Sequence, residues 1–143
     1  MIVLLLFALL SAPDYRPFVA HSQRAFEEDF DLTHHYWRVP SHLRFARFRG
    51  TAAQLREIAE RNSRLLAERD SGLSKFFALW KPDEPEKIFV PVFADLANFR
   101  DEPVWVVVFN WDYEKNGRMS ARRILVVAAR QSTGEVVIYQ PDQ

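Results

Sequence analysis

Residues 104–129 read VWVVVFNWDYEKNGRMSARRILVVAA, and this stretch decides the fold. Asn116-Gly117 is the pair favoured in a two-residue type I′ turn, because both central positions of that turn need a positive φ. The β-branched and aromatic runs on either side complete the pattern of a β-hairpin. A third β-prone segment, Val136–Tyr139, follows turn residues at 131–134. We therefore predict an antiparallel meander over residues 104–140.

The hairpin predicts which residues face each other. With a two-residue loop, Trp111 lies opposite Arg122 and Phe109 lies opposite Ile124. Since side chains alternate along a strand, one face of the first strand carries Trp105, Val107, Phe109, Trp111 and Tyr113, here called the aromatic row. The other face carries Val106, Val108, Asn110 and Asp112. Trp111 and Arg122 are then placed for a cation–π contact.

A helix is predicted from Thr51 to Arg69. Thr51-Ala-Ala-Gln54 is a capping-box pattern, in which the hydroxyl and the amide side chain satisfy first-turn amides reciprocally. An amphipathic stripe follows, made of Leu55, Ile58, Ala59, Leu65 and Leu66. Asn62 interrupts this stripe, so it either lies at the solvent edge or bonds a specific partner. Gly72 is predicted to end the helix, and the helix is expected to pack on the aromatic row.

The remaining segments give shorter predictions. Residues 88–93 predict another strand, which Pro91 restricts to a sheet edge or a bulge. A short helix is predicted over residues 22–30 and an extended segment over 32–39. Together these elements predict an α+β fold with one main helix packed on an antiparallel meander sheet.

Composition limits the classes of function. The chain has 143 residues, which is the size of a single domain, and its 19 Lys and Arg balance its 19 Asp and Glu. Bulk charge therefore favours no nucleic-acid partner and no attraction to a membrane surface. There is no cysteine, which excludes disulfides, thiolate catalysis and zinc–thiolate sites.

The first residues bear on the compartment. Ile2 to Ala12, IVLLLFALLSA, form an uncharged apolar run that ends in small residues and is followed by Pro13. The run is shorter than the roughly 20 residues that a membrane-spanning helix needs. We expect residues 1–12 to be a signal peptide cleaved after Ala12, and residues 13–143 to form one domain outside the cytoplasm. A buried N-terminal strand or helix in an intracellular protein is the alternative.

The sequence holds no recognised catalytic motif: G-x-S-x-G, the phosphate-binding P-loop and G-x-G-x-x-G are all absent. A metal site from Asp31, His35 and His42 is geometrically conceivable, but we interpret these residues as surface or half-buried groups without metal. Basic and aromatic residues alternate over 44–49, which we interpret as an amphipathic segment with a solvated Arg edge. We expect no cofactor.

A helix followed by a meander that closes in Thr133-Gly134-Glu135-Val136 resembles the cystatin-like folds and the PepSY-type domains of exported bacterial proteins. In those domains a strand ends in Asp-x-x-Thr-Gly-x-Val before the last strand; here Arg130 stands at the Asp position. The Gln-x-Val-x-Gly hairpin of protease-inhibiting cystatins is absent. The resemblance implies an architecture and a non-enzymatic exported module.

Three functions follow as hypotheses. The first is a small exported binding domain for a protein or an apolar ligand, with a surface formed by Trp105, Phe109, Trp111, Tyr113 and Arg122. The second is an enzyme or ligand binder resembling the nuclear-transport-factor-2 (NTF2-like) fold, with a pocket lined by His35, Asn110, Asp112 and Tyr113. The third is an intracellular interaction or immunity-type protein. Strand edges at 88–93 or 136–139 leave a homodimer open.

Overall fold

The computed structural model of the chain describes residues 15–27, 30–36, 50–81, 85–114, 118–119 and 123–141. Three helices lie in these residues: α2 (Leu32–Tyr36), α3 (Ala52–Arg69) and α4 (Ser71–Leu79). The strands are β1 (Phe18–Ala20), β2 (Ala25–Phe26), β3 (Gly50–Thr51), β4 (Lys87–Phe99), β5 (Glu102–Tyr113), β6 (Arg118–Met119), β7 (Arg123–Arg130) and β8 (Val136–Pro141).

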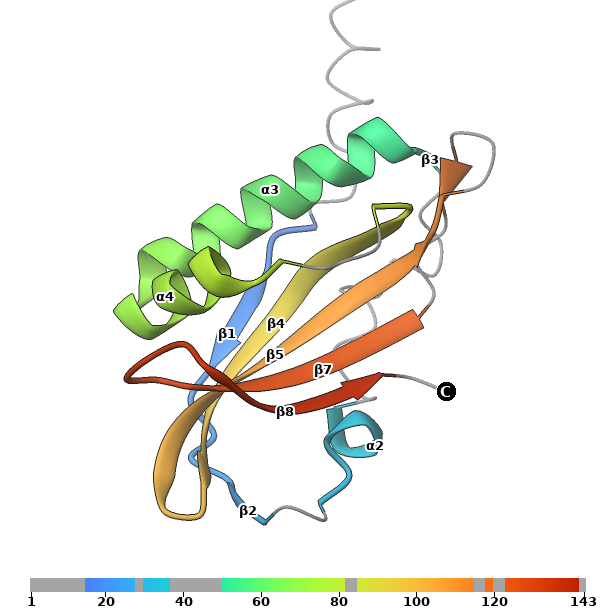
Figure 1. The fold of residues 1–143 in the computed structure, drawn as a ribbon. Helices are drawn as coiled ribbons and strands as arrows, with labels where there is room; N and C mark the ends of the chain where they lie inside the picture. The colour runs from blue at the N-terminus through green and yellow to red at the C-terminus, as the bar shows by residue number, and fades with distance from the viewer. Residues whose placement is uncertain are drawn as a thin grey trace, which may run out of the picture.

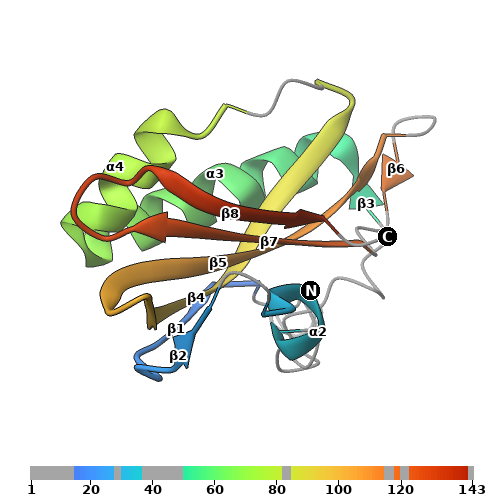
Figure 2. The same ribbon diagram turned by 60° about the horizontal axis from the view of Figure 1, so that its bottom comes forward.

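The predicted α+β fold is confirmed. A six-stranded sheet has the order β1-β4-β5-β7-β8, with β2 also paired to β4 (Figure 2). β4, β5, β7 and β8 are antiparallel neighbours, so the predicted meander is present. The two short strands β1 and β2 join β4 in parallel, which makes the sheet mixed. In Figure 1, α3 and α4 lie above the sheet and α2 lies below it. β3 and β6 form a separate two-stranded ribbon.

The predicted register of the hairpin is wrong by one residue. Trp111 lies opposite Arg123 and Phe109 opposite Leu125, not opposite Arg122 and Ile124. Because a slip of one residue exchanges the two faces of a strand, the aromatic row shares its face with Leu125, Val127 and Ala129. Among the described residues, the pairing of β5 with β7 runs from Val104 to Trp111, and β6 pairs with β3. Asn116, Gly117 and Arg122 lie outside the described residues.

The helix at residues 51–69 forms as predicted, with both hydrogen bonds of the capping box. The Thr51 hydroxyl accepts from the Gln54 N–H at 3.2 Å, and the Thr51 N–H donates to the Gln54 amide oxygen at 2.9 Å.

Asn62 is fully buried and bonds specific partners. Its side-chain N–H groups donate to the carbonyls of Tyr15 at 2.7 Å and Pro91 at 3.0 Å. The register of β4 shifts between Pro91 and Phe93, so the bulge that the proline predicted is present. Asn62 ties α3 to this bulge.

Contrary to the prediction, Gly72 does not end α3; it lies in the first turn of α4. Between the two helices Asp70 adopts an extended conformation, and its carboxylate accepts from the N–H groups of Gly72 at 2.7 Å and Leu73 at 3.2 Å. The same oxygen accepts from the indole N–H of Trp105 at 2.7 Å. Asp70 therefore begins α4 and fixes it to β5.

The sheet has one apolar cluster on each face. The first includes Val104, Val106 and Val108 with Leu32 and Tyr36 of α2, and the first turns of α3 contribute Ala52 and Leu55. The second contains the aromatic row, to which α3 contributes Leu66 and α4 contributes Leu73 and Phe76. α3 packs along β4, so the helix that covers the aromatic row is α4 instead.

Two predictions for the N-terminal region are wrong. Residues 22–27 contain β2 and irregular backbone in place of a helix, and residues 32–36 form α2 in place of an extended segment. Asp31 begins α2, because its carboxylate accepts from the N–H of His34 at 2.9 Å.

The proposed signal peptide, His42 and the basic–aromatic segment at 44–49 lie outside the described residues. Within the part of the chain that the structure describes, no helix is long and apolar enough to cross a membrane.

Candidate functional site

The aromatic row lies beneath α4. Trp105, Phe109 and Trp111 are buried and Tyr113 is half-buried. Trp80, at the end of α4, stacks on Phe109 with 5.1 Å between ring centroids, and Phe76 contacts the same ring at 6.3 Å. The row therefore forms the interior of the second cluster, and a ligand meets this cluster only at its margins.

One margin is cationic. Arg123 takes the position expected for Arg122, with its guanidinium carbon 5.2 Å from the centre of the Trp111 ring and 5.6 Å from that of Tyr113. The ammonium of Lys87 lies 4.7 Å and 5.2 Å from the same two rings. Both cations thus lie against the end of the aromatic row.

The polar residues of the second hypothesis do not share one face. Asn110 is buried and Asp112 half-buried on the face of the first cluster, whereas Tyr113 belongs to the second. His35 lies on α2, where its ring contacts Phe30 at 5.6 Å and Tyr36 at 4.8 Å. Burial, with a smaller contribution from Arg24, lowers the pKa of His35, and Asp95 opposes this shift. The described residues include no group of three or more acidic or His side chains arranged to hold a metal ion.

A buried carboxylate that the sequence interpretation missed lies beneath α2. Asp95 on β4 is 2% exposed and accepts hydrogen bonds from the N–H of Ser22 at 2.8 Å, from the hydroxyl of Ser22 at 2.5 Å and from the phenol of Tyr36 at 2.5 Å. Burial, followed by the hydrogen bond to Asp95, raises the pKa of Tyr36 far above its ordinary value, so the phenol stays a donor. The sequence feature that could have revealed this buried group is the single Asp within the apolar run of β4. The group joins β4 to α2 and to the chain that follows β1.

The second margin of the aromatic row is apolar and exposed. Leu79 at the end of α4 is 59% exposed, and Val136 and Tyr139 on β8 are 45% and 55% exposed. Half-buried Trp80 lies among them, with its ring 6.5 Å from that of Tyr139. We call these four residues the apolar strip. Beside them is a depression of about 330 Å³ lined by Phe76, Leu79, Trp80, Gly134, Glu135 and Val136.

Two backbone features create the strip. Gly134 has φ +76°, and a Cβ there would lie 2.5 Å from the backbone nitrogen of Phe76, so only glycine lets the β7–β8 turn approach α4 this closely. In β8, Val136 pairs with Ala129 and Ile138 with Ala128, which leaves Val137 as a bulge. Because of this extra residue, Val136 and Tyr139 point to the same face of the sheet although they are three positions apart.

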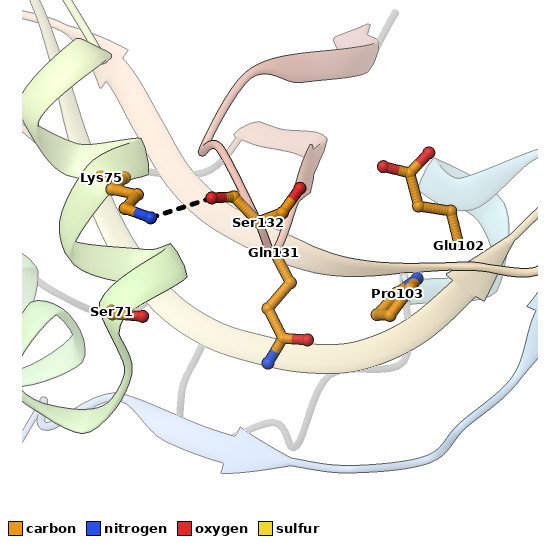
Figure 3. Close-up of a pocket in the computed structure, with 6 residues that line it drawn as sticks. All are labelled: Ser71, Lys75, Glu102, Pro103, Gln131 and Ser132. Carbon is orange, nitrogen blue, oxygen red and sulfur yellow. Dashed lines mark hydrogen bonds between the residues drawn. The ribbon is translucent and has the colours of Figure 1, made fainter.

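A second depression, of about 270 Å³, lies between the start of α4, the start of β5 and the β7–β8 turn (Figure 3). It is lined by Ser71, Lys75, Glu102, Pro103, Gln131 and Ser132. The Lys75 ammonium donates to the Ser132 carbonyl at 2.9 Å, and Glu102 forms an ion pair with Arg130 at 3.0 Å. Both charged side chains of this depression already have protein partners, so it offers a ligand less than the apolar strip does.

Comparison of the chain with models of protein families, with curated proteins and with solved structures found no match in any of the three.

Proposed function

We propose that the chain is a small binding domain that uses the apolar strip to bind an apolar segment of a partner protein. One observation carries this proposal: of the four large apolar side chains that are exposed in the described residues, Leu79, Val136 and Tyr139 gather around Trp80. The fourth, Phe18, lies apart and stacks on Phe93. Single exposed apolar residues are ordinary, whereas a contiguous group beside a depression is typical of an interaction site.

The chemistry of the strip supports a protein partner. Aromatic side chains are enriched where binding energy concentrates, and the strip contains two of them, Trp80 and Tyr139. Trp80 is held by Phe109 and Phe76, so little of its conformational freedom remains to be lost on binding. Glu135, the charged residue of the depression, pairs with Arg130 at 3.2 Å. The strip therefore favours apolar side chains over charged ones.

The test is selection of random displayed peptides on the immobilised wild-type chain, followed by titration of the selected peptides against variants. We expect Leu79→Lys to weaken binding by at least about tenfold, since a charge then faces an apolar side chain. Lysine suits the last turn of α4, so the helix should persist. Phe18→Lys is the matched control, an equally large change at an exposed apolar site elsewhere, and it should leave binding unchanged. Equal binding to all three proteins would place the binding surface elsewhere.

We also propose that the domain works outside the cytoplasm, with residues 1–12 removed as a signal peptide. The support is the apolar run Ile2–Ala12 and its small residues before Pro13. The intact mass of the natural protein from its own cells, with its cell fraction, tests this. We expect the mass of a chain whose first residue is Pro13, recovered from an exported fraction. A cytoplasmic product that keeps residues 2–12 would contradict the proposal.

A further inference from the structure

We infer that the partner segment binds as an added β-strand on the open edge of β8, with one of its apolar side chains in the depression beside Trp80. This inference rests on the proposed function and specifies its geometry. It is carried by three features: the hydrogen-bonding direction of β8, the bulge at Val137 and the small extent of the apolar strip.

The backbone of β8 offers hydrogen bonds on its outer side. Among the described strands β8 ends the sheet and pairs with β7 alone. The N–H of Arg130 donates to the carbonyl of Glu135 at 2.8 Å, so the backbone of Arg130 points toward β8. By alternation Ala128 and Val126 point the same way, and their partners are Ile138 and Gln140. Tyr139, between those partners, therefore directs its N–H and C=O away from β7.

The bulge joins this open edge to the apolar strip. It brings Val136 and Tyr139 to the face on which Trp80 lies, as the ring contact of Tyr139 and the lining of the depression show. A strand added beside Tyr139 would direct every second side chain to the same face. One of these side chains would lie over Tyr139, and a neighbour two positions along would reach the depression between Leu79 and Val136.

The size of the surface favours a short peptide over a second copy of the chain. A strand of the length of β8 spans roughly 20 Å, and with a sheet-to-helix width of roughly 10 Å the strip offers about 200 Å². A stable protein–protein contact needs about 800 Å² from each partner. The end of β8 is also occupied: Gln140 accepts from the N–H of Thr33 at 3.1 Å and donates to the Phe30 carbonyl at 3.1 Å. The added strand therefore ends near Tyr139.

The required chemistry of the partner follows from these features. It is an extended segment with apolar side chains at alternate positions, because every second residue meets the strip. It lacks proline at the residue that pairs with Tyr139, since that residue must donate and accept hydrogen bonds. No charge is required of it, as the carboxylate of Glu135 is already paired with Arg130.

The experiment compares Tyr139→Ala with Tyr139→Pro, using the peptides selected on the wild-type chain as the probe. Both variants lose the phenol ring, and Tyr139→Pro also loses the outward N–H. A strand tolerates proline at a position whose N–H faces away from the sheet, because no hydrogen bond within the sheet is lost there. We therefore expect both variants to fold. We expect Tyr139→Pro to bind about fivefold more weakly than Tyr139→Ala, the effect of one lost hydrogen bond. Equal affinities would overturn the added strand.

A second measurement needs no variant. Hydrogen exchange of the Tyr139 amide in the wild-type chain should slow at least about tenfold at saturating peptide, because the amide becomes hydrogen-bonded. Unchanged exchange would overturn the inference even if Tyr139→Pro fails to fold. Selected peptides whose apolar residues recur at every third or fourth position would also overturn it, since they indicate a helix on the strip.

The two proposals fail in different ways. If Leu79→Lys leaves peptide affinity unchanged, the proposed function fails. If Leu79→Lys weakens binding while Tyr139→Pro equals Tyr139→Ala, only the added strand fails. Sedimentation of the chain without peptide tests a second copy as the occupant: a dimer that Tyr139→Pro dissociates would replace the peptide by another β8 strand and overturn the inference.

Discussion

At the scale of single residues, polar side chains in the interior connect elements that apolar contacts alone would hold loosely. Asn62 and Asp95 are both almost completely enclosed, and both act on the backbone or side chains of distant segments. Asn62 joins α3 to the bulge of β4, and Asp95 joins β4 to α2. Buried polar groups with satisfied hydrogen bonds specify one arrangement of the elements, since other packings leave them without partners.

Replacing Asn62 tests this directly. Asn62→Ala removes the donors to the carbonyls of Tyr15 and Pro91 and leaves a cavity, so we expect the free energy of unfolding to fall by about 2–4 kcal/mol. Glu60→Ala, on the exposed side of the same helix, should change it by less than about 0.5 kcal/mol. Urea titration followed by far-UV circular dichroism measures both. An Asn62→Leu variant as stable as the wild type would show that the amide hydrogen bonds contribute no net stability.

His35 gives the chain a predictable response to acid. Its pKa is lowered in the folded state, mainly by burial, so the unfolded chain takes up a proton at a higher pH than the folded one. Stability linked to His35 is therefore intact above the ordinary His pKa of about 6.5 and is lost as the pH falls below it. Between about pH 7.5 and 5.5 the wild type should lose more free energy of unfolding than His35→Gln, which has no proton to gain. Parallel stability curves for the two proteins would contradict this.

At the scale of elements, the break between α3 and α4 depends on close contact with the β7–β8 turn. A Cβ on Gly72 would lie 2.2 Å from the carbonyl oxygen of Gln131, which is backbone and cannot move aside freely. Gly72→Ala should therefore destabilise the fold by about 2 kcal/mol, although alanine alone would favour a helix by about 1 kcal/mol. Ser74→Ala, at an exposed position of α4, should be neutral or stabilising by about 0.5 kcal/mol. If thermal unfolding shows Gly72→Ala to be stabilising, the turn does not lie against α4.

Local patterns predicted the elements well where the partner was adjacent in the sequence. The capping box of Thr51, the strand at 136–139 and the bulge at Pro91 each follow from a few neighbouring residues. The register of β5 on β7 did not follow, because it depends on the whole connection between Trp111 and Arg123, and one residue in that connection exchanges the faces. The apolar strip escaped prediction for a similar reason: the bulge at Val137 is visible only against β7.

Segments whose conformation depends on distant contacts were also missed. The five residues that the structure describes in α2 are too few for a helix that is stable by itself. They are held by Leu32 in the first cluster, by Tyr36 on Asp95 and by Thr33 on Gln140. Nothing local in Leu32–Tyr36 favours a helix strongly. β1 and β2 are short strands that pair in parallel with the second half of β4. The partners are separated by some 75 positions, so the hydrophobic pattern near β1 and β2 does not predict this pairing.

At the scale of the whole molecule, both apolar clusters share one sheet. Successive residues of β5 alternate between them, so Val106 belongs to the first cluster and Val107 to the second. Loss of packing on one face must therefore disturb the strands that support the other. This coupling predicts that the helices on opposite sides of the sheet unfold together.

We accordingly expect a single cooperative unfolding transition that damage to either face shifts as a whole. Leu32→Ala in the first cluster and Phe76→Ala in the second should each lower the free energy of unfolding by about 2–5 kcal/mol. Tryptophan emission, to which Trp105 and Trp111 of the second cluster contribute, and far-UV circular dichroism should give the same midpoint in each variant. If Leu32→Ala shifted the far-UV transition and left the emission transition in place, the two faces would unfold separately. The second cluster, which supports the apolar strip, would then stay packed after the first cluster is lost.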